Sequence, residues 1–105
     1  NTNTLALKYD YFAVDALVFK NVKSTSCKLV NRNNGRGIKL DYPEVPVVMV
    51  WTKPNAPYIC IEPWFGAPDH INSNYQITDK FAIQSVEADK TFTVKRVITA
   101  LEAVK

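Results

Sequence analysis

Apolar and polar residues alternate with a period of two along most of the chain, which indicates β-strands rather than helices. The pattern predicts seven strands, at residues 15–20, 26–32, 35–42, 47–52, 58–63, 80–87 and 91–100. Residues 99–105 have helical propensity, but this segment is too short and too close to the terminus to predict a helix. The sequence therefore predicts an all-β fold, an antiparallel β-sandwich formed by one domain over residues 1–105.

The turns between the predicted strands are marked by Asn, Gly and Pro. NRNNG, residues 31–35, is the clearest signal because Asn-Gly tolerates a positive φ, and it predicts a hairpin over residues 26–42. Residues 47–52, VVMVWT, are apolar on both faces and predict a buried strand. We expect this strand and residues 58–63 to be neighbours in the middle of a sheet, with Trp51 in the core. Residues 66–79 hold Gly, Pro, Asn and Asp and predict a long loop.

Composition excludes several classes of protein. The 105 residues suffice for one small domain, and a hydrophobic fraction of 47% is typical of a globular protein. The 13 basic and 10 acidic residues are scattered, so no basic patch predicts nucleic-acid binding. The sequence shows neither a long apolar run nor a signal peptide, and we expect a cytoplasmic protein. Because the chain begins with Asn1 rather than Met, and residues 1–12 already run into a strand-like pattern, the chain is expected to be processed or cut from something longer.

The two cysteines, Cys27 and Cys60, match no zinc or redox spacing. Cys60 lies in an apolar strand and is expected to behave as a small hydrophobic residue. A Cys27–Cys60 disulfide stays open as an alternative. The lone histidine and the dispersed acids show no ligand spacing, so no metal or cofactor is implied.

One carboxylate lies in the most aromatic part of the chain, YICIEPWFGAPDHIN, residues 58–72. Alternation places Tyr58 and Glu62 on one strand face, opposite two isoleucines, and Trp64 and Phe65 follow. Aromatic rings stack on the C–H groups of sugars while a carboxylate binds their hydroxyls, and an apolar surround favours a general base near neutral pH. The pattern indicates a sugar site, while the alternative is an edge-strand glutamate that faces solvent.

This stretch resembles the C-terminal signature of the aldose 1-epimerase (galactose mutarotase) family, and is most similar to a divergent bacterial branch with the signature Cys-Ile-Glu-Pro-Trp-x-Gly. The matching positions in this chain are Glu62, Pro68, Asp69 and Asn72, then Asp15-Ala16-Leu17, Trp51 and Asp79-Lys80. The better-known mutarotases have a Gln soon after the Glu, where Trp64 stands here, so the sugar preference is left open.

The resemblance implies that a Glu takes the proton of the anomeric hydroxyl while a His protonates the ring oxygen, so that α and β anomers interconvert. Glu62 matches the catalytic base, and Asp15 matches an Asp that binds substrate hydroxyls. The other candidate substrate-binding residues are Tyr58, Trp64, Phe65, Asp69 and His70. The catalytic histidines of the family lie upstream of the part matched here, and His70 is expected in a loop at the mouth of the site.

Members of the family are longer and fold as a β-supersandwich, so this chain resembles the C-terminal third of one and is expected to be inactive alone. Two other hypotheses remain open. One is a sugar-binding module without turnover, and the other is a structural β-sandwich whose open face pairs with another chain. The expected partners are an aldohexose and either a second copy or the missing N-terminal part. We expect no contact with nucleic acid or membrane.

Overall fold

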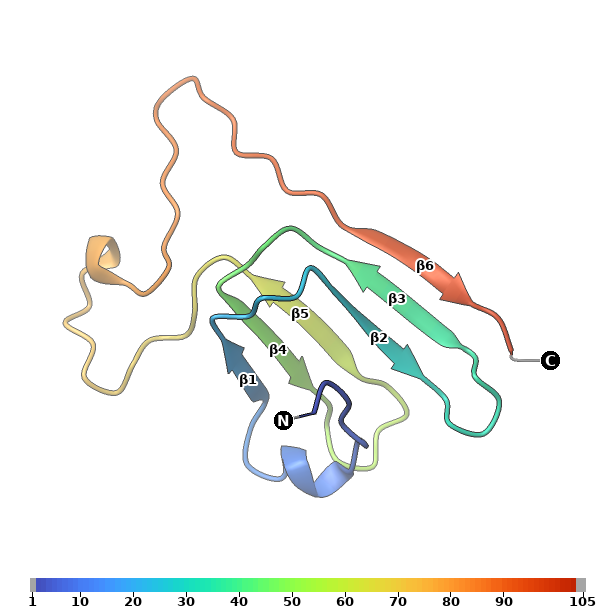
Figure 1. Ribbon diagram of the computed structural model, residues 1–105. Helices are drawn as coiled ribbons and strands as arrows, with labels where there is room; N and C mark the ends of the chain where they lie inside the picture. Colours follow the sequence, from blue (N-terminus) through green and yellow to red (C-terminus); the bar gives the residue numbers. More distant parts are fainter. Residues whose placement is uncertain (1, 104–105) are drawn as a thin grey trace.

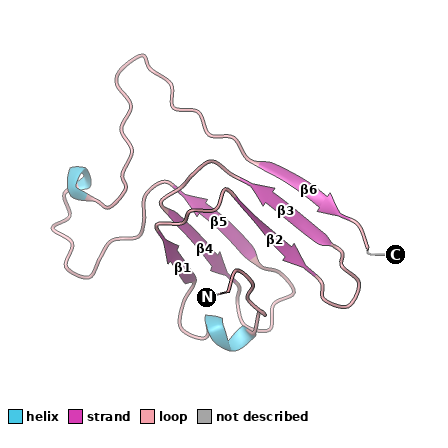
Figure 2. Cartoon of the chain, in the orientation of Figure 1, coloured by secondary structure: helices cyan, strands magenta, loops and turns pink. Residues whose placement is uncertain are grey.

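A computed structural model describes residues 2–103, which form two antiparallel three-stranded sheets (Figures 1 and 2). The first sheet has the order β1 (Leu17–Lys20), β4 (Val47–Trp51), β5 (Cys60–Trp64). The second has the order β2 (Ser26–Val30), β3 (Gly37–Asp41), β6 (Val97–Leu101). Two short 3-10 helices accompany them, η1 (Tyr9–Phe12) and η2 (Ile77–Asp79). Within residues 2–103, no helix has the length and apolar character needed to cross a bilayer.

The two sheets pack face to face, which confirms the predicted all-β sandwich. Leu40 of β3 and Val48 of β4 belong to one buried cluster, here called the inter-sheet core. Its other buried members are Tyr42 and Val45, and Val22, Cys27, Ile61 and Phe65 pack against it. A second buried cluster, here called the outer cluster, consists of Val47, Met49 and Ala67 with Ala16 and Trp64 packed against it. Because neighbouring residues of β4 enter different clusters, β4 is buried on both faces, as its apolar sequence predicts.

The predicted hairpin over residues 26–42 is confirmed. β2 and β3 pair antiparallel, with Val30 opposite Gly37. In the turn between them, the N–H of Gly35 donates to the carbonyl of Asn31 at 2.8 Å. Gly35 has a φ of 75°, a conformation in which a residue without Cβ is not strained.

The prediction for residues 58–63 is correct in type but wrong in position. The strand starts at Cys60, and β5 lies at the edge of its sheet rather than in the middle. Proline lacks an N–H to donate, so Pro63 suits this edge. The prediction that Trp51 lies in the core is also wrong. Trp51 ends β4 and is partly exposed there, with its ring centroid 6.0 Å from that of Tyr58.

The predicted strand at residues 80–87 is absent from the described chain, and the one predicted at 91–100 is confirmed only from Val97 onward. Between β5 and β6 much of the chain runs outside both sheets and pairs with no strand (Figures 1 and 2). Ala82 has a φ of 55°, which breaks extended backbone. A strand begins only where β3 becomes available as a partner for residues 97–101. The predicted loop at 66–79 is confirmed, with η2 at its end.

The inter-sheet core does not extend under β6, and this gives a stability prediction. Leu40 and Ile98 are opposite each other on β3 and β6, yet Leu40 is 8% exposed and Ile98 is 70% exposed. We expect Leu40→Ala to lower the free energy of unfolding by about 2–5 kcal/mol. Ile98→Ala, its matched control, should change it by about 0.5 kcal/mol, as expected of an exposed site. Urea denaturation measures both changes in the free energy of unfolding. Equal losses would contradict the finding that the inter-sheet core includes Leu40 and excludes Ile98.

Candidate functional site

Glu62 lies in the middle of β5, on the face of the first sheet that points away from the inter-sheet core. The register places it opposite Met49 of β4, and Met49 is opposite Val18 of β1. Ile61, the residue before it, packs against the inter-sheet core. The predicted alternation of Ile61 and Glu62 is therefore confirmed, and the carboxylate lies at the end of an apolar row.

Trp64 holds the carboxylate of Glu62. Its Nε1 donates a hydrogen bond to Oε2 of Glu62 at 3.0 Å. The indole itself packs against the outer cluster, opposite Val47. Because the ring is fixed by packing, its N–H fixes the direction of the carboxylate. Among residues 2–103, Trp64 is the one hydrogen-bond partner of this carboxylate, and Oε1 accepts no hydrogen bond.

The local sequence explains why Glu62 and Trp64 meet. Residues two apart in a strand point to the same face, and only Pro63 separates these two. After Phe65 the chain turns at Gly66, whose φ of 104° is rarely adopted by residues with a Cβ. Gly66 is buried, and the next residue, Ala67, belongs to the outer cluster against which the indole packs. The motif Glu-Pro-Trp-x-Gly thus encodes one compact unit at the end of β5.

Phe65 points away from this unit. It packs against the inter-sheet core and contacts Phe92 edge to face, with ring centroids 5.2 Å apart and an interplanar angle of 84°. Alternation separates it from Trp64, so within the described chain Phe65 is a packing residue.

Tyr58 does not lie beside Glu62 either. It precedes β5 and lines an open hollow of about 570 Å³ at one end of the sandwich. That hollow is mostly apolar, with Leu7, Phe12 and Leu29 among its lining residues. The structure does not place Tyr58 and Glu62 in one cleft.

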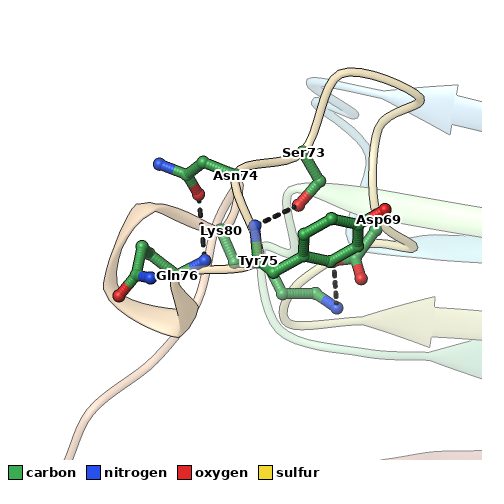
Figure 3. Close-up of polar contacts among 6 residues, drawn as sticks. All are labelled: Asp69, Ser73, Asn74, Tyr75, Gln76 and Lys80. Carbon is green, nitrogen blue, oxygen red and sulfur yellow. Dashed lines mark hydrogen bonds and ion pairs between the residues drawn. The ribbon is translucent and has the colours of Figure 1, made fainter.

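Asp69 and His70 lie in the exposed loop after β5. Asp69 Oδ1 forms an ion pair with Lys80 Nζ at 2.9 Å, which ties the two ends of the loop together (Figure 3). Between them, the Ser73 hydroxyl and the Asn74 side chain accept hydrogen bonds from backbone N–H groups two residues on (Figure 3). His70 is exposed, and its Nδ1 accepts a hydrogen bond from the N–H of Asn72 at 3.2 Å. This loop therefore has an ordered shape of its own.

Asp15 lies at the opposite side of the sheet. It precedes β1, is exposed, and accepts a hydrogen bond from the N–H of Ala16 at 2.7 Å. Since β4 separates β1 from β5, the described chain does not bring Asp15 next to Glu62.

Sequence reasoning missed three neighbours of the Glu62 unit. Met49 is the cross-strand partner of Glu62, and Lys20 shares a row with Val47 and Trp64, its Nζ lying 5.6 Å from the centroid of the Phe81 ring. Arg96 donates from Nη2 to the carbonyl of Pro63 at 3.0 Å. None of these contacts has a local sequence signal, because each depends on which strands pair. No group of three or more His, Cys, Asp or Glu residues in the described range could hold a metal ion.

The two cysteines are not joined, and Cys27 has a perturbed pKa. Burial raises the pKa of the Cys27 thiol above its ordinary value, and the negative charge of Asp41 raises it further. Since the thiolate is the reactive form, we expect Cys27 to be alkylated more slowly in the folded chain than in the unfolded chain at pH 8. Asp41→Asn should raise the rate, by less than unfolding does, because burial is the larger cause.

Iodoacetamide labelling in a Cys60→Ser background measures this rate for Cys27 alone. Glu44→Asn, which changes an exposed acid elsewhere, is the control. Equal rates in the folded and unfolded states would contradict the burial of the thiol.

The chain is similar to protein LacX of Lactococcus lactis subsp. lactis, in both its plasmid and its chromosomal forms. Each is 31% identical over 87 residues, which cover 82% of this chain and 29% of the LacX protein. The chain thus spans less than a third of the length of these relatives. No protein-family model and no solved structure matches the chain.

Proposed function

We propose that Glu62 is the general base of a sugar isomerase of the aldose 1-epimerase type, and that this chain is the C-terminal part of that enzyme. The observation that carries the proposal is the state of the Glu62 carboxylate. Trp64 holds one of its oxygens at 3.0 Å, the row beside it is apolar, and Oε1 is left to take a proton.

The chemistry asked of Glu62 is modest and well defined. Its carboxylate removes the proton from the anomeric hydroxyl, the sugar ring opens, the C1–C2 bond rotates, and the ring closes on the other face. A positioned general base contributes about 10²–10⁴-fold to such a step. The acid that protonates the ring oxygen comes, in this proposal, from a part of the longer protein outside this chain.

The surroundings of Glu62 suit a sugar. The partly exposed indole of Trp64 offers an apolar face to C–H groups. Met49, opposite Glu62, is buried in the outer cluster, and Val18 beyond it is 45% exposed. A sugar bound there would bring its anomeric hydroxyl within reach of Oε1. Mutarotation by the longer protein, with and without Glu62→Gln, tests the proposal.

The extent of the chain agrees with a partial site. Asp15 lies across β4 from Glu62, Tyr58 lines a separate hollow, and the chain spans 29% of the length of its LacX relatives. We therefore propose that the isolated chain is inactive and that further substrate-binding groups come from the rest of the protein.

Three exposed apolar side chains support the proposal that this chain pairs with the rest of the longer protein or with a second copy of itself. Ile71, Tyr75 and Ile77 are 91%, 85% and 71% exposed in the segment that joins β5 to β6. Large apolar side chains gathered on one segment are typical of a surface that is covered in an assembly.

A sugar-binding module without turnover is the second candidate. The observation that favours it is that His70, the single histidine of the chain, lies in an exposed loop and not beside Glu62. Under this alternative Trp64 and Glu62 bind the sugar, and the longer protein shows binding without any rate of anomer exchange.

A further inference from the structure

Arg96 makes a long-range contact with the backbone of the Glu62 unit. It lies directly before β6, in a different sheet from β5, and its Nη2 donates to the carbonyl of Pro63 at 3.0 Å. Pro63 is the residue between Glu62 and Trp64. The contact therefore joins the end of the long excursion after β5 to the centre of the candidate site.

The guanidinium of Arg96 is embedded. Its Nη1 is buried and has no hydrogen-bond partner among residues 2–103, while the side chain as a whole is only partly exposed. Removing a charged donor from water is unfavourable, and here the hydrogen bond to Pro63 is the one that offsets it. An arginine that lay fully in solvent would not carry this cost, so we infer that the buried guanidinium has a specific structural role.

The carbonyl of Pro63, which accepts the hydrogen bond from Arg96, controls the direction of the next side chain. The ring of proline fixes φ near −65°, so ψ is the single soft backbone dihedral left at Pro63. The peptide plane after Pro63 carries both its carbonyl and the N–H of Trp64, so holding the carbonyl holds that plane and sets ψ. In turn, ψ at Pro63 sets the direction of the Trp64 side chain relative to the side chain of Glu62.

A second contact secures the same piece of chain. Phe92, four residues before Arg96, packs edge to face on Phe65, with ring centroids 5.2 Å apart. The returning segment is thus attached to the end of β5 at a backbone carbonyl and at a ring. Both attachments are at residues next to Trp64 in the sequence, Pro63 and Phe65.

We propose that Arg96 is a positioning residue that holds the Glu62 carboxylate in its working direction by fixing the Pro63 carbonyl and, through it, Trp64. The importance of this for catalysis rests on the proposed function of Glu62, but the geometric role does not. The role is therefore tested by a measurement that needs no turnover.

The measurement is acrylamide quenching of Trp64 fluorescence in a Trp51→Phe background, where Trp64 is the remaining one of the two tryptophans. Arg96→Met removes the donor and keeps the stem. Loss of a hydrogen bond from a charged donor should raise the population with an open Glu62–Trp64 contact by about ten-fold, and so raise the quenching constant. Arg96→Lys, which keeps a charge and a donor, should give an intermediate rise. Lys95→Met, at the adjacent exposed position, should give none.

A double-mutant cycle with Glu62→Ala distinguishes positioning from general loosening. Because the indole stays packed against the outer cluster, the quenching constant reports whether the Glu62–Trp64 contact is open. Arg96→Met should therefore raise quenching when Glu62 is present and have little further effect in Glu62→Ala, where no contact is left to open. An equal rise in both backgrounds, or no rise in either, overturns the proposal. Should Arg96→Met fail to fold by circular dichroism, the same comparison with Arg96→Lys decides. Coupling found here together with no mutarotation in the longer protein would reject the isomerase and keep the positioning role.

Discussion

Glu62→Gln is expected to lower the mutarotation rate of the longer protein by at least about 10²-fold, with little change in fold or sugar binding. Glutamine is nearly isosteric with glutamate, and its amide oxygen can still accept the hydrogen bond that Trp64 Nε1 donates at 3.0 Å. It cannot take a proton as a carboxylate does. The loss should therefore appear in kcat rather than in the affinity for sugar.

Polarimetry on freshly dissolved α-glucose or α-galactose measures the rate after the spontaneous reaction is subtracted. Glu44→Gln, at an exposed glutamate, is the matched control and should keep the parent rate. Turnover close to that of the parent in Glu62→Gln would remove Glu62 from the mechanism. Sugar binding that is lost in the variant, with no turnover in the parent, would favour the binding module.

Gly37→Ala is expected to cost about 3 kcal/mol or more in the free energy of unfolding, or to prevent folding. Gly37 begins β3 and is paired on both sides, with Val30 of β2 and with Leu101 of β6. A Cβ at this position would collide with the backbone carbonyl of Leu29 and lie 3.0 Å from the Cα of Val30. Both neighbours are backbone atoms, so the collision can be relieved only if the hairpin itself moves.

Urea denaturation followed by circular dichroism measures this cost. Gly66→Ala is the informative control. Apart from its two chain neighbours, no described residue has an atom within 4 Å of the added Cβ, so its cost comes from a φ of 104°. We expect that backbone cost to be about 1–2 kcal/mol. A Gly37→Ala protein as stable as the parent would show that β2 and β3 can separate without loss, contrary to the pairing described.

The parts of the fold that sequence predicts well are those determined by near neighbours. The hairpin over 26–42 follows from the turn at 31–35, and the burial of β4 follows from its apolar run. Residues 80–87 and 91–96 alternate as a strand does, yet none of them is paired, because no strand lies beside them. Alternating apolar and polar residues show that a segment could form a strand. Whether it does so depends on whether another strand lies beside it in the fold.

The same distinction applies to the candidate site. The face of Glu62 and its nearness to Trp64 are both predictable, because they depend on a spacing of two within one strand. The separation of Tyr58 from Glu62 is not, since it depends on where β5 begins. The contact of Arg96 with Pro63 joins residues 33 positions apart, and no local pattern reports it.

The pairing of β6 with β3 has a consequence for the order in which the domain opens. The chain between β3 and β6 includes β4, β5 and the long excursion after β5, so closing it costs more chain entropy than closing the short connections of β2–β3 or β4–β5. In return β6 buries little, since Ile98 stays 70% exposed. β6 should therefore be the first strand to detach in brief sub-global openings of the native state, and the last to attach during folding. Because Arg96 immediately precedes β6, each such opening would release the Pro63 carbonyl, so the lifetime of an aligned Glu62 would be set by the least stable strand of the domain.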